Sequence, residues 1–113
     1  MSTSSVIGLS IDTADAGKLA AFWAEVLGST VSEGATAESA AVDGTPRLAF
    51  HQVPEAKQVK NRLHLDLLSK EFDVELERLL GLGASQVNEV RQGGAHWITL
   101  ADPEGNEFDL VEG

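Results

Sequence analysis

The sequence predicts an α+β fold in which two tandem βαβββ modules bring their sheets together as a curved cup. The order strand, helix, three strands occurs twice, with a period of roughly 55 residues that indicates a duplicated module and not a solenoid. The spacing from Gly8 to Asp15 recurs between His64 and Glu71, and both predicted helices end on a Leu-Gly pair. A ferredoxin-like sandwich is the alternative, but it leaves too few strands for the segments after Gly83.

Module one is predicted at about residues 6–53, within a single domain of 113 residues. Its first strand is expected at 6–12, where apolar residues alternate with small or polar ones. A helix follows between an N-cap at Asp15 and a left-handed C-cap at Gly28, with one apolar stripe along it. Three shorter strands, the last two joined by an Asp-Gly turn, are expected at 30–33, 38–42 and 47–53.

A polar linker is expected at 54–61, followed by module two at about 62–112. The first strand of module two is expected at 62–68, where leucines alternate with polar residues. A second helix is expected to begin near Ser69 and to end at Gly83. The remaining strands, the last two joined by a turn of sequence DPEGN, are expected at 84–90, 95–101 and 107–112.

The composition excludes several classes of partner and location. The chain has 18 acidic and 8 basic residues, a formal net charge of −10, and no cysteine. This acidic balance disfavours nucleic acid as a partner, because a phosphate backbone would be repelled. The longest apolar stretch, 19–24, is too short to span a membrane, and the first residues lack the basic and apolar regions of a secretory signal. Absence of cysteine suits a reducing compartment, so a cytoplasmic location is expected.

The turn between the last two strands predicts that Ala101 pairs with Glu107. Two sets of side chains then lie on opposite faces of the sheet. The wholly apolar set belongs under the helix, and its predicted pairs are Ile98 with Leu110 and Leu100 with Phe108. The mixed set belongs on the concave wall of the cup, and its predicted pairs are Thr99 with Asp109 and Trp97 with Val111.

The same alternation places further polar side chains on the concave wall. Leu48 and Phe50 are expected under the first helix. The concave positions of the other strands are Gly8, Ser10, Asp12, Ala49, His51, Val53, His64 and Asp66. Such a wall holds more polarity than a packed interior tolerates without a ligand or water, so we expect it to bind a small molecule.

Several short stretches, in one order along nearly the whole chain, carry a family resemblance. They are Asp15 with Phe22-Trp23 and Leu27-Gly28, the segment 60–67 (KNRLHLDL), Leu82-Gly83-Ala84, and the segment 102–110 (DPEGNEFDL). On these stretches the chain resembles the vicinal-oxygen-chelate superfamily of glyoxalase I, bleomycin-resistance proteins and extradiol dioxygenases, and most closely its small glyoxalase-like domains. The resemblance implies the glyoxalase/bleomycin-resistance fold and a homodimer.

In metal-using relatives the ligands come from the first and last strands of each module. The resemblance carries them to Gly8, Ala49, His64 and Asp109. Glycine and alanine offer no ligand atom, so half of the set survives and no cofactor is expected. His51 lies on the same strand face as Ala49, and His51, His64 and Asp109 would form a two-histidine, one-carboxylate set for a divalent metal. Alternatively, both histidines hydrogen-bond to carboxylates and shape the cup.

Other candidates each have a structural alternative. Asp66 either orients His64 or pairs with Arg62. Arg62 belongs to a basic cluster that either binds an anion or forms a solvated linker. Trp97 either stacks on a planar ligand or packs as a half-buried strand residue. His96 falls on the helix side of its strand, where no functional role is expected.

Three functions fit these residues, and the sequence leaves open whether the protein is an enzyme. The first is binding of a small molecule without turnover, as in bleomycin-resistance relatives. The second is a metal-dependent lyase, isomerase or dioxygenase acting through His64, Asp109 and His51. The third is a metal-free enzyme in which His64 and Asp109 form an acid–base pair. The expected ligand contacts are His51, Asp66, Trp97, Thr99, Arg62 and Ser10.

Overall fold

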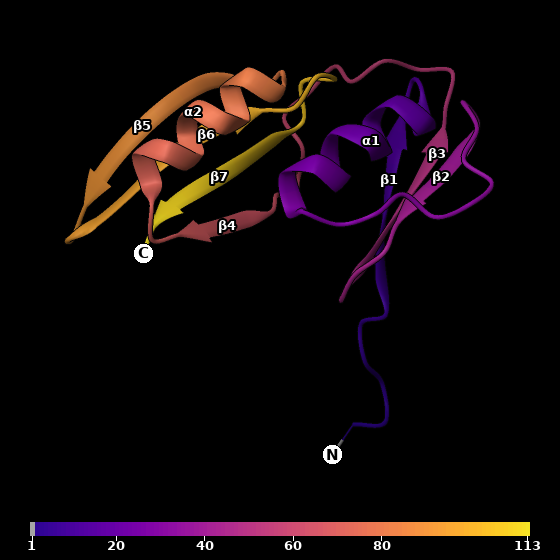
Figure 1. Ribbon diagram of the computed structural model, residues 1–113, viewed down its shortest axis with the longest axis horizontal. Coiled ribbons are helices and arrows are strands. Elements are labelled where there is room, and N and C mark those ends of the chain that lie inside the picture. Colours follow the sequence, from indigo (N-terminus) through magenta and orange to yellow (C-terminus); the bar gives the residue numbers. More distant parts are fainter. Residues whose placement is uncertain (1) are drawn as a thin grey trace. The chain divides into compact units, whose positions relative to one another are not determined.

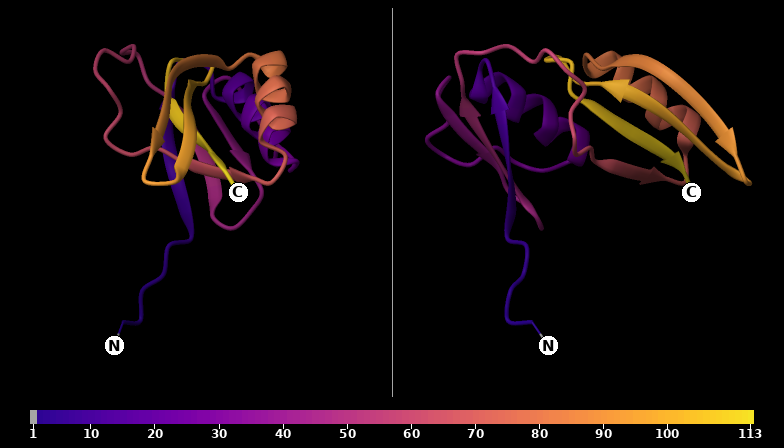
Figure 2. Two further views of the ribbon diagram at one scale, coloured as in Figure 1. Left: turned by 90° about the vertical axis from the view of Figure 1, so that its left-hand side faces the viewer. Right: turned by 180° about the vertical axis from the view of Figure 1, so that it is seen from behind.

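Two units make up the chain in the computed structural model, which describes residues 2–113 (Figure 1). Unit one ends at Ala56 and unit two starts at Lys57, inside the predicted linker 54–61. In each unit one helix packs on one face of one sheet (Figures 1 and 2). We call the opposite face, which carries no helix of that unit, the helix-free face. Neither helix in the described part of the chain has the length and apolarity needed to cross a bilayer.

Unit one contains β1 (Gly8–Thr13), α1 (Ala16–Leu27), β2 (Ser39–Val42) and β3 (Arg47–Gln52). Its strand order is β1-β3-β2, with β1 parallel and β2 antiparallel to β3. A parallel neighbour requires a crossover connection, and α1 lies in that crossover. Leu48 and Phe50 are buried under α1, which confirms the predicted face. The first strand begins two residues later than expected, and Ile7 is exposed.

Both predicted caps of α1 are confirmed. The Asp15 carboxylate accepts a hydrogen bond from the backbone N–H of Lys18 at 3.1 Å, which satisfies one of the free donors of the first turn. Gly28 ends the helix with φ 62°, a backbone conformation that other residues adopt only with strain. Gly83 ends the second helix in the same left-handed region.

The strand expected at 30–33 is reduced to one bridge, between Val31 and Val42. The hydrogen bonds Asp43 N–H to Thr30 O and Ser32 N–H to Ala41 O flank it. The pairing stops there because the following residues form a turn. The Thr36 hydroxyl accepts backbone N–H groups two and three residues on, which competes with a strand ladder. Module one is therefore βαββ with an added bridge.

Unit two contains β4 (Asp66–Ser69), α2 (Phe72–Leu82), β5 (Ser85–Gln92), β6 (Ala95–Ala101) and β7 (Glu107–Glu112). The strand order is β4-β7-β6-β5, with β4 parallel to β7 and the other pairs antiparallel. The predicted register of β6 and β7 is confirmed throughout, and the apolar pairs of that register are buried. The α+β fold with two strand–helix–sheet modules is therefore confirmed.

The first strand of module two, expected at 62–68, begins only at Asp66. The Asn61 side chain bonds to the backbone of Leu63 and Glu107 and holds the chain beside β7 before regular pairing starts. Leu63 is consequently 81% exposed, although its alternation with Leu65 predicts a buried position. At the next helix, Ser69 accepts the N–H of Glu71, which is itself the N-cap and makes no side-chain cap bond.

Candidate functional site

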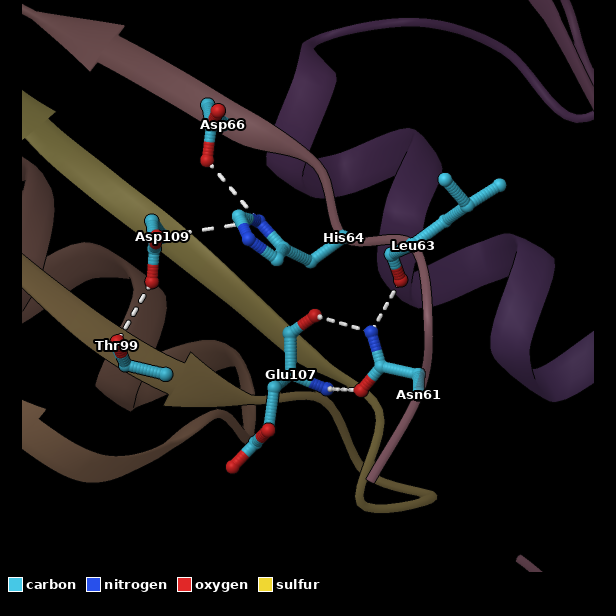
Figure 3. A network of polar contacts seen from close by, with 7 residues as sticks. All are labelled: Asn61, Leu63, His64, Asp66, Thr99, Glu107 and Asp109. Atoms are coloured by element: carbon cyan, nitrogen blue, oxygen red, sulfur yellow. Dashed lines mark hydrogen bonds and ion pairs between the residues drawn. The ribbon is translucent and has the colours of Figure 1, made fainter. Parts of the chain in front are cut away.

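A network of polar side chains lies on the helix-free face of the unit-two sheet (Figure 3). The pleat separates it from the core, since Phe108 and Leu110 are buried on the side of α2 while Asp109 points the other way. Asp66 on β4 is the direct neighbour of Asp109 on β7. His64 precedes β4 by two residues, and its Nδ1 faces both carboxylates (Figure 3).

Asp109 is the most firmly held member of this network. It lies on β7, an inner strand of the sheet, and its side chain is 16% exposed. The Thr99 hydroxyl, directly opposite on β6, donates to Asp109 Oδ1 at 2.6 Å. This short bond to an ionised acceptor fixes the carboxylate, and Oδ2 remains available to other donors.

His64 Nδ1 faces two carboxylates, of which only that of Asp66 is within hydrogen-bond distance. Its Nδ1 lies 3.1 Å from Asp66 Oδ1 and 3.8 Å from Asp109 Oδ2. Because both neighbours are carboxylates, we assign the hydrogen of a neutral ring to Nδ1, which leaves the lone pair on Nε2. The imidazole is 43% exposed, so a ligand can reach it. The arrangement fits either a ligand-binding histidine or an oriented metal ligand.

Asn61 positions the segment that carries His64, and sequence reasoning missed it by placing it in the linker. Its amide nitrogen donates to the carbonyls of Leu63 and Glu107, and its amide oxygen accepts the N–H of Glu107 at 3.0 Å (Figure 3). An asparagine side chain offers the same donor and acceptor as a peptide group, so it extends the pairing of β7 where β4 has not begun. The sequence signal that could have identified Asn61 is its place within segment 60–67, one of the stretches that carry the family resemblance.

The other predicted site residues divide between the units. Trp97 lies on the same face of unit two as Thr99 and Asp109, and it is half-buried. Arg62 is exposed, and among residues 2–113 no ion pair joins it to Asp66. The alternative role of Asp66, orienting His64, is the one that the contacts support.

Ser10 and His51 lie on the helix-free face of unit one. His51 borders a shallow polar hollow between β3 and the loop before β2. The hollow is lined by Ser32, Glu33, Gly34, Ala35, Ser39, Ala40, Ala41, Arg47, Ala49 and His51. The set of His51 with His64 and Asp109 stays a prediction. Within unit two Asp66 supplies a third donor, and one ligand atom from each of His64, Asp66 and Asp109 lies within 4.8 Å of the others.

His96 is a structural histidine, as expected from its side of the strand. Its Nε2 lies 2.7 Å from Glu89 Oε2 and its Nδ1 3.0 Å from Glu112 Oε1, while the ring contacts Phe72 of α2. Hydrogen bonds to Glu89 and, next, to Glu112 raise the pKa of His96, against the opposing effects of burial and Arg91. The His96 side chain thus links β5, β6 and β7.

The contacts of His96 with Glu89 and Glu112 predict that the stability of the protein depends on pH. Because folding raises the pKa of His96, protonation of this side chain stabilises the folded protein. The contribution is complete below the pKa of the unfolded state, about 6.5, and is lost as the pH rises through the higher pKa of the folded state. Urea unfolding at pH 6 and pH 9 is therefore expected to show a larger loss of stability for the wild type than for His96→Gln. Equal losses in both proteins would contradict the assignment.

Comparisons with known proteins agree with this architecture. The sequence model described as "Glyoxalase-like domain" matches residues 8–111. A search of curated proteins finds no match. A glyoxalase/bleomycin resistance protein/dioxygenase family enzyme from Burkholderia phytofirmans is similar in structure, with a TM-score of 0.78 at 20% identity, covering 96% of this chain and 98% of that one.

Two further solved structures are similar. Lactoylglutathione lyase from Agrobacterium tumefaciens has a TM-score of 0.70 at 17% identity, over 97% of this chain and 94% of its own. Fosfomycin resistance protein FosX from Listeria monocytogenes, solved as a variant with Mn(II) and 1S,2S-dihydroxypropylphosphonic acid, has a TM-score of 0.80 at 16% identity, over 100% and 92%. At such identities these likenesses show the fold alone.

Proposed function

Since this chain belongs to the family of glyoxalase-like domains, we propose that it binds a small molecule on the helix-free face of unit two without converting it. The observation that carries the proposal is the preorganised His64 network. Asp66 contacts the imidazole at Nδ1, Asp109 lies beside the same nitrogen, and Thr99 holds Asp109. A site whose polar groups are already oriented binds a ligand with little loss of side-chain entropy.

The polar groups of this site determine which hydrogen-bonding groups a ligand must carry. His64 Nε2 and the free oxygens of Asp66 and Asp109 are acceptors, so the complementary ligand carries hydrogen-bond donors. The positions that correspond to the family's ligands in module one hold Gly8 and Ala49. Neither side chain can bind a metal or move a proton, which favours binding over turnover.

The proposal is tested by a thermal-shift screen of a metabolite library, followed by titration of each hit against the wild type and His64→Ala. Hits are expected to raise the melting temperature of the wild type and to lose that effect in the variant. Mass spectrometry of the hit after incubation is expected to return it unchanged. Formation of a product would replace the binding function with an enzymatic one.

A second candidate is a metal-dependent lyase, isomerase or dioxygenase, and the donor set of unit two favours it. Ligand atoms around one ion lie roughly 3–4 Å apart, and those of His64, Asp66 and Asp109 lie within 4.8 Å, so small side-chain movements would allow all three to bind. These three residues would hold the ion, which when bound would polarise a substrate oxygen.

Metal analysis separates the two candidates. Because the family positions at Gly8 and Ala49 carry no ligand, protein purified without chelator is expected to contain less than one equivalent of zinc, nickel, iron or manganese. The measurement is elemental analysis, with His64→Ala as the matched control. About one tightly held ion per chain, absent from the control, would establish the metal-dependent candidate.

The homodimer stays a prediction. The unit-two sheet ends on β4 and β5, and natural proteins cover or pair such edges. Light scattering that shows a 12.0 kDa monomer at micromolar concentration would contradict it.

A further inference from the structure

The helix-free face of unit two is divided into two neighbouring rows, each of which crosses all four strands. The strand register defines them. The polar row is Asp66, Asp109, Thr99 and Asn88, and the apolar row is Leu68, Val111, Trp97 and Val90. Consecutive same-face residues of a strand are about 7 Å apart, so the two rows run side by side at that distance.

The apolar row is long enough to support an extended ring system. Neighbouring strands are about 4.8 Å apart, so four strands give a row of roughly 14 Å. Leu68 is 71% exposed, while Trp97, Val111 and Val90 are half-buried. None of them belongs to the core under α2, which is built from the opposite faces of the same strands. A flat apolar body lying across Trp97 would cover this row.

The polar side of the face is acidic. Asp66 and Asp109 lie in the polar row, and Glu107 precedes Asp109 by two residues on the same face of β7. Glu107 Oε1 is buried and has no hydrogen-bond partner among residues 2–113. These three carboxylates make the field on this face negative, so the face favours a ligand that brings positive charge and N–H groups.

Charge also determines whether a second copy of the chain or a small molecule can cover the apolar row. A second copy of the chain, with a net charge of −10, would be repelled from this acidic face, so the predicted homodimer would form through another surface, such as the open sheet edges. A small cation would be attracted by the same field. The face is therefore complementary to a cationic small molecule and not to another copy of this protein.

We propose that the ligand of this site is a flat, apolar cation whose ring system lies across the Leu68, Val111, Trp97 and Val90 row and whose protonated nitrogen faces Asp109 and Asp66. The inference rests on the binding function proposed above and adds the chemical class of the ligand. Trp97 supplies a stacking surface, and the carboxylates supply the charge.

The test is a fluorescence titration at physiological salt with three dyes of related shape. Proflavine is a flat cation, acridine is the same ring system without the charge at neutral pH, and anilinonaphthalene sulfonate is an aromatic anion. Proflavine is expected to bind the wild type at least about tenfold more tightly than either of the others. Spermidine, a cation without rings, is expected to compete poorly.

Substitutions in the two rows test whether proflavine binds to this face. Asp109→Asn is expected to weaken proflavine binding at least about tenfold, and Trp97→Leu about threefold to tenfold. Leu68→Ala changes an exposed residue and serves as a second test of the apolar row should Trp97→Leu fold poorly. Glu77→Gln removes one charge from an exposed position on α2 and is expected to change the affinity by less than about twofold.

Two results would overturn the inference: tighter binding of the anionic dye, or proflavine binding that Asp109→Asn and Leu68→Ala leave unchanged. Its failure is distinguishable from that of the proposed function. If proflavine does not bind while a library hit still depends on His64, the ligand class is wrong and the binding face stands. If no hit depends on His64, the binding function itself fails.

Discussion

Asparagine in place of Asp109 is expected to weaken ligand binding at least about tenfold while the protein stays folded. The substitution preserves the shape of the side chain and still accepts the Thr99 hydroxyl, but it removes the charge that faces His64. A lost hydrogen bond to a charged group costs about 1.5–3 kcal/mol, which corresponds to this loss of affinity. Calorimetric titration with a screening hit, or with proflavine, measures it.

The matched control for this variant is Glu77→Gln, which removes the same charge from the far side of the unit-two sheet. Its affinity is expected to stay within about twofold of that of the wild type. A similar loss in both variants would show that net charge, and not the position of Asp109, determines binding.

Alanine in place of Leu110 is expected to lower the free energy of unfolding by roughly 2–5 kcal/mol. Leu110 is 0% exposed on β7 beneath α2, so the truncation leaves a cavity in the core of unit two. His64→Ala changes a side chain that is 43% exposed and lies on the opposite face of the sheet. It is expected to destabilise far less, which urea unfolding of both variants measures.

Comparing the stabilities of His64→Ala and Leu110→Ala shows whether His64 is a binding-site residue or a core residue. If His64→Ala unfolds as readily as Leu110→Ala, then His64 supports the fold and the binding face must lie elsewhere. Leu65 would be a weaker reference than Leu110, because it precedes β4 and is only half-buried.

Turn chemistry and apolar alternation predicted most of the fold. The DPEGN turn alone predicted the register of β6 and β7, and with it the pairing of Thr99 and Asp109. Helix caps were readable because Asp15 and Gly28 satisfy local backbone requirements that few other residues meet. These features depend on neighbours in sequence, which is why one sequence suffices to predict them.

Features that depend on distant contacts were not predictable in the same way. Alternation extended the first strand of module two to residue 62, but the Asn61 contact with β7 delays it to Asp66. That contact joins residues 46 positions apart in sequence, and Leu63 beside it is 81% exposed. Asp66 was predicted as a ligand contact and as a partner of either His64 or Arg62, but not as a metal ligand, whereas its register with Asp109 places it in the donor set.

The most direct test of the proposed binding face is an NMR titration of isotope-labelled protein with a screening hit, followed through the backbone amide signals. The largest shifts are expected at His64, Asp66, Thr99 and Asp109, with smaller shifts along the row that contains Trp97. Largest shifts at residues of α2, with those around His64 unmoved, would contradict the account and place the ligand on the other side of the sheet.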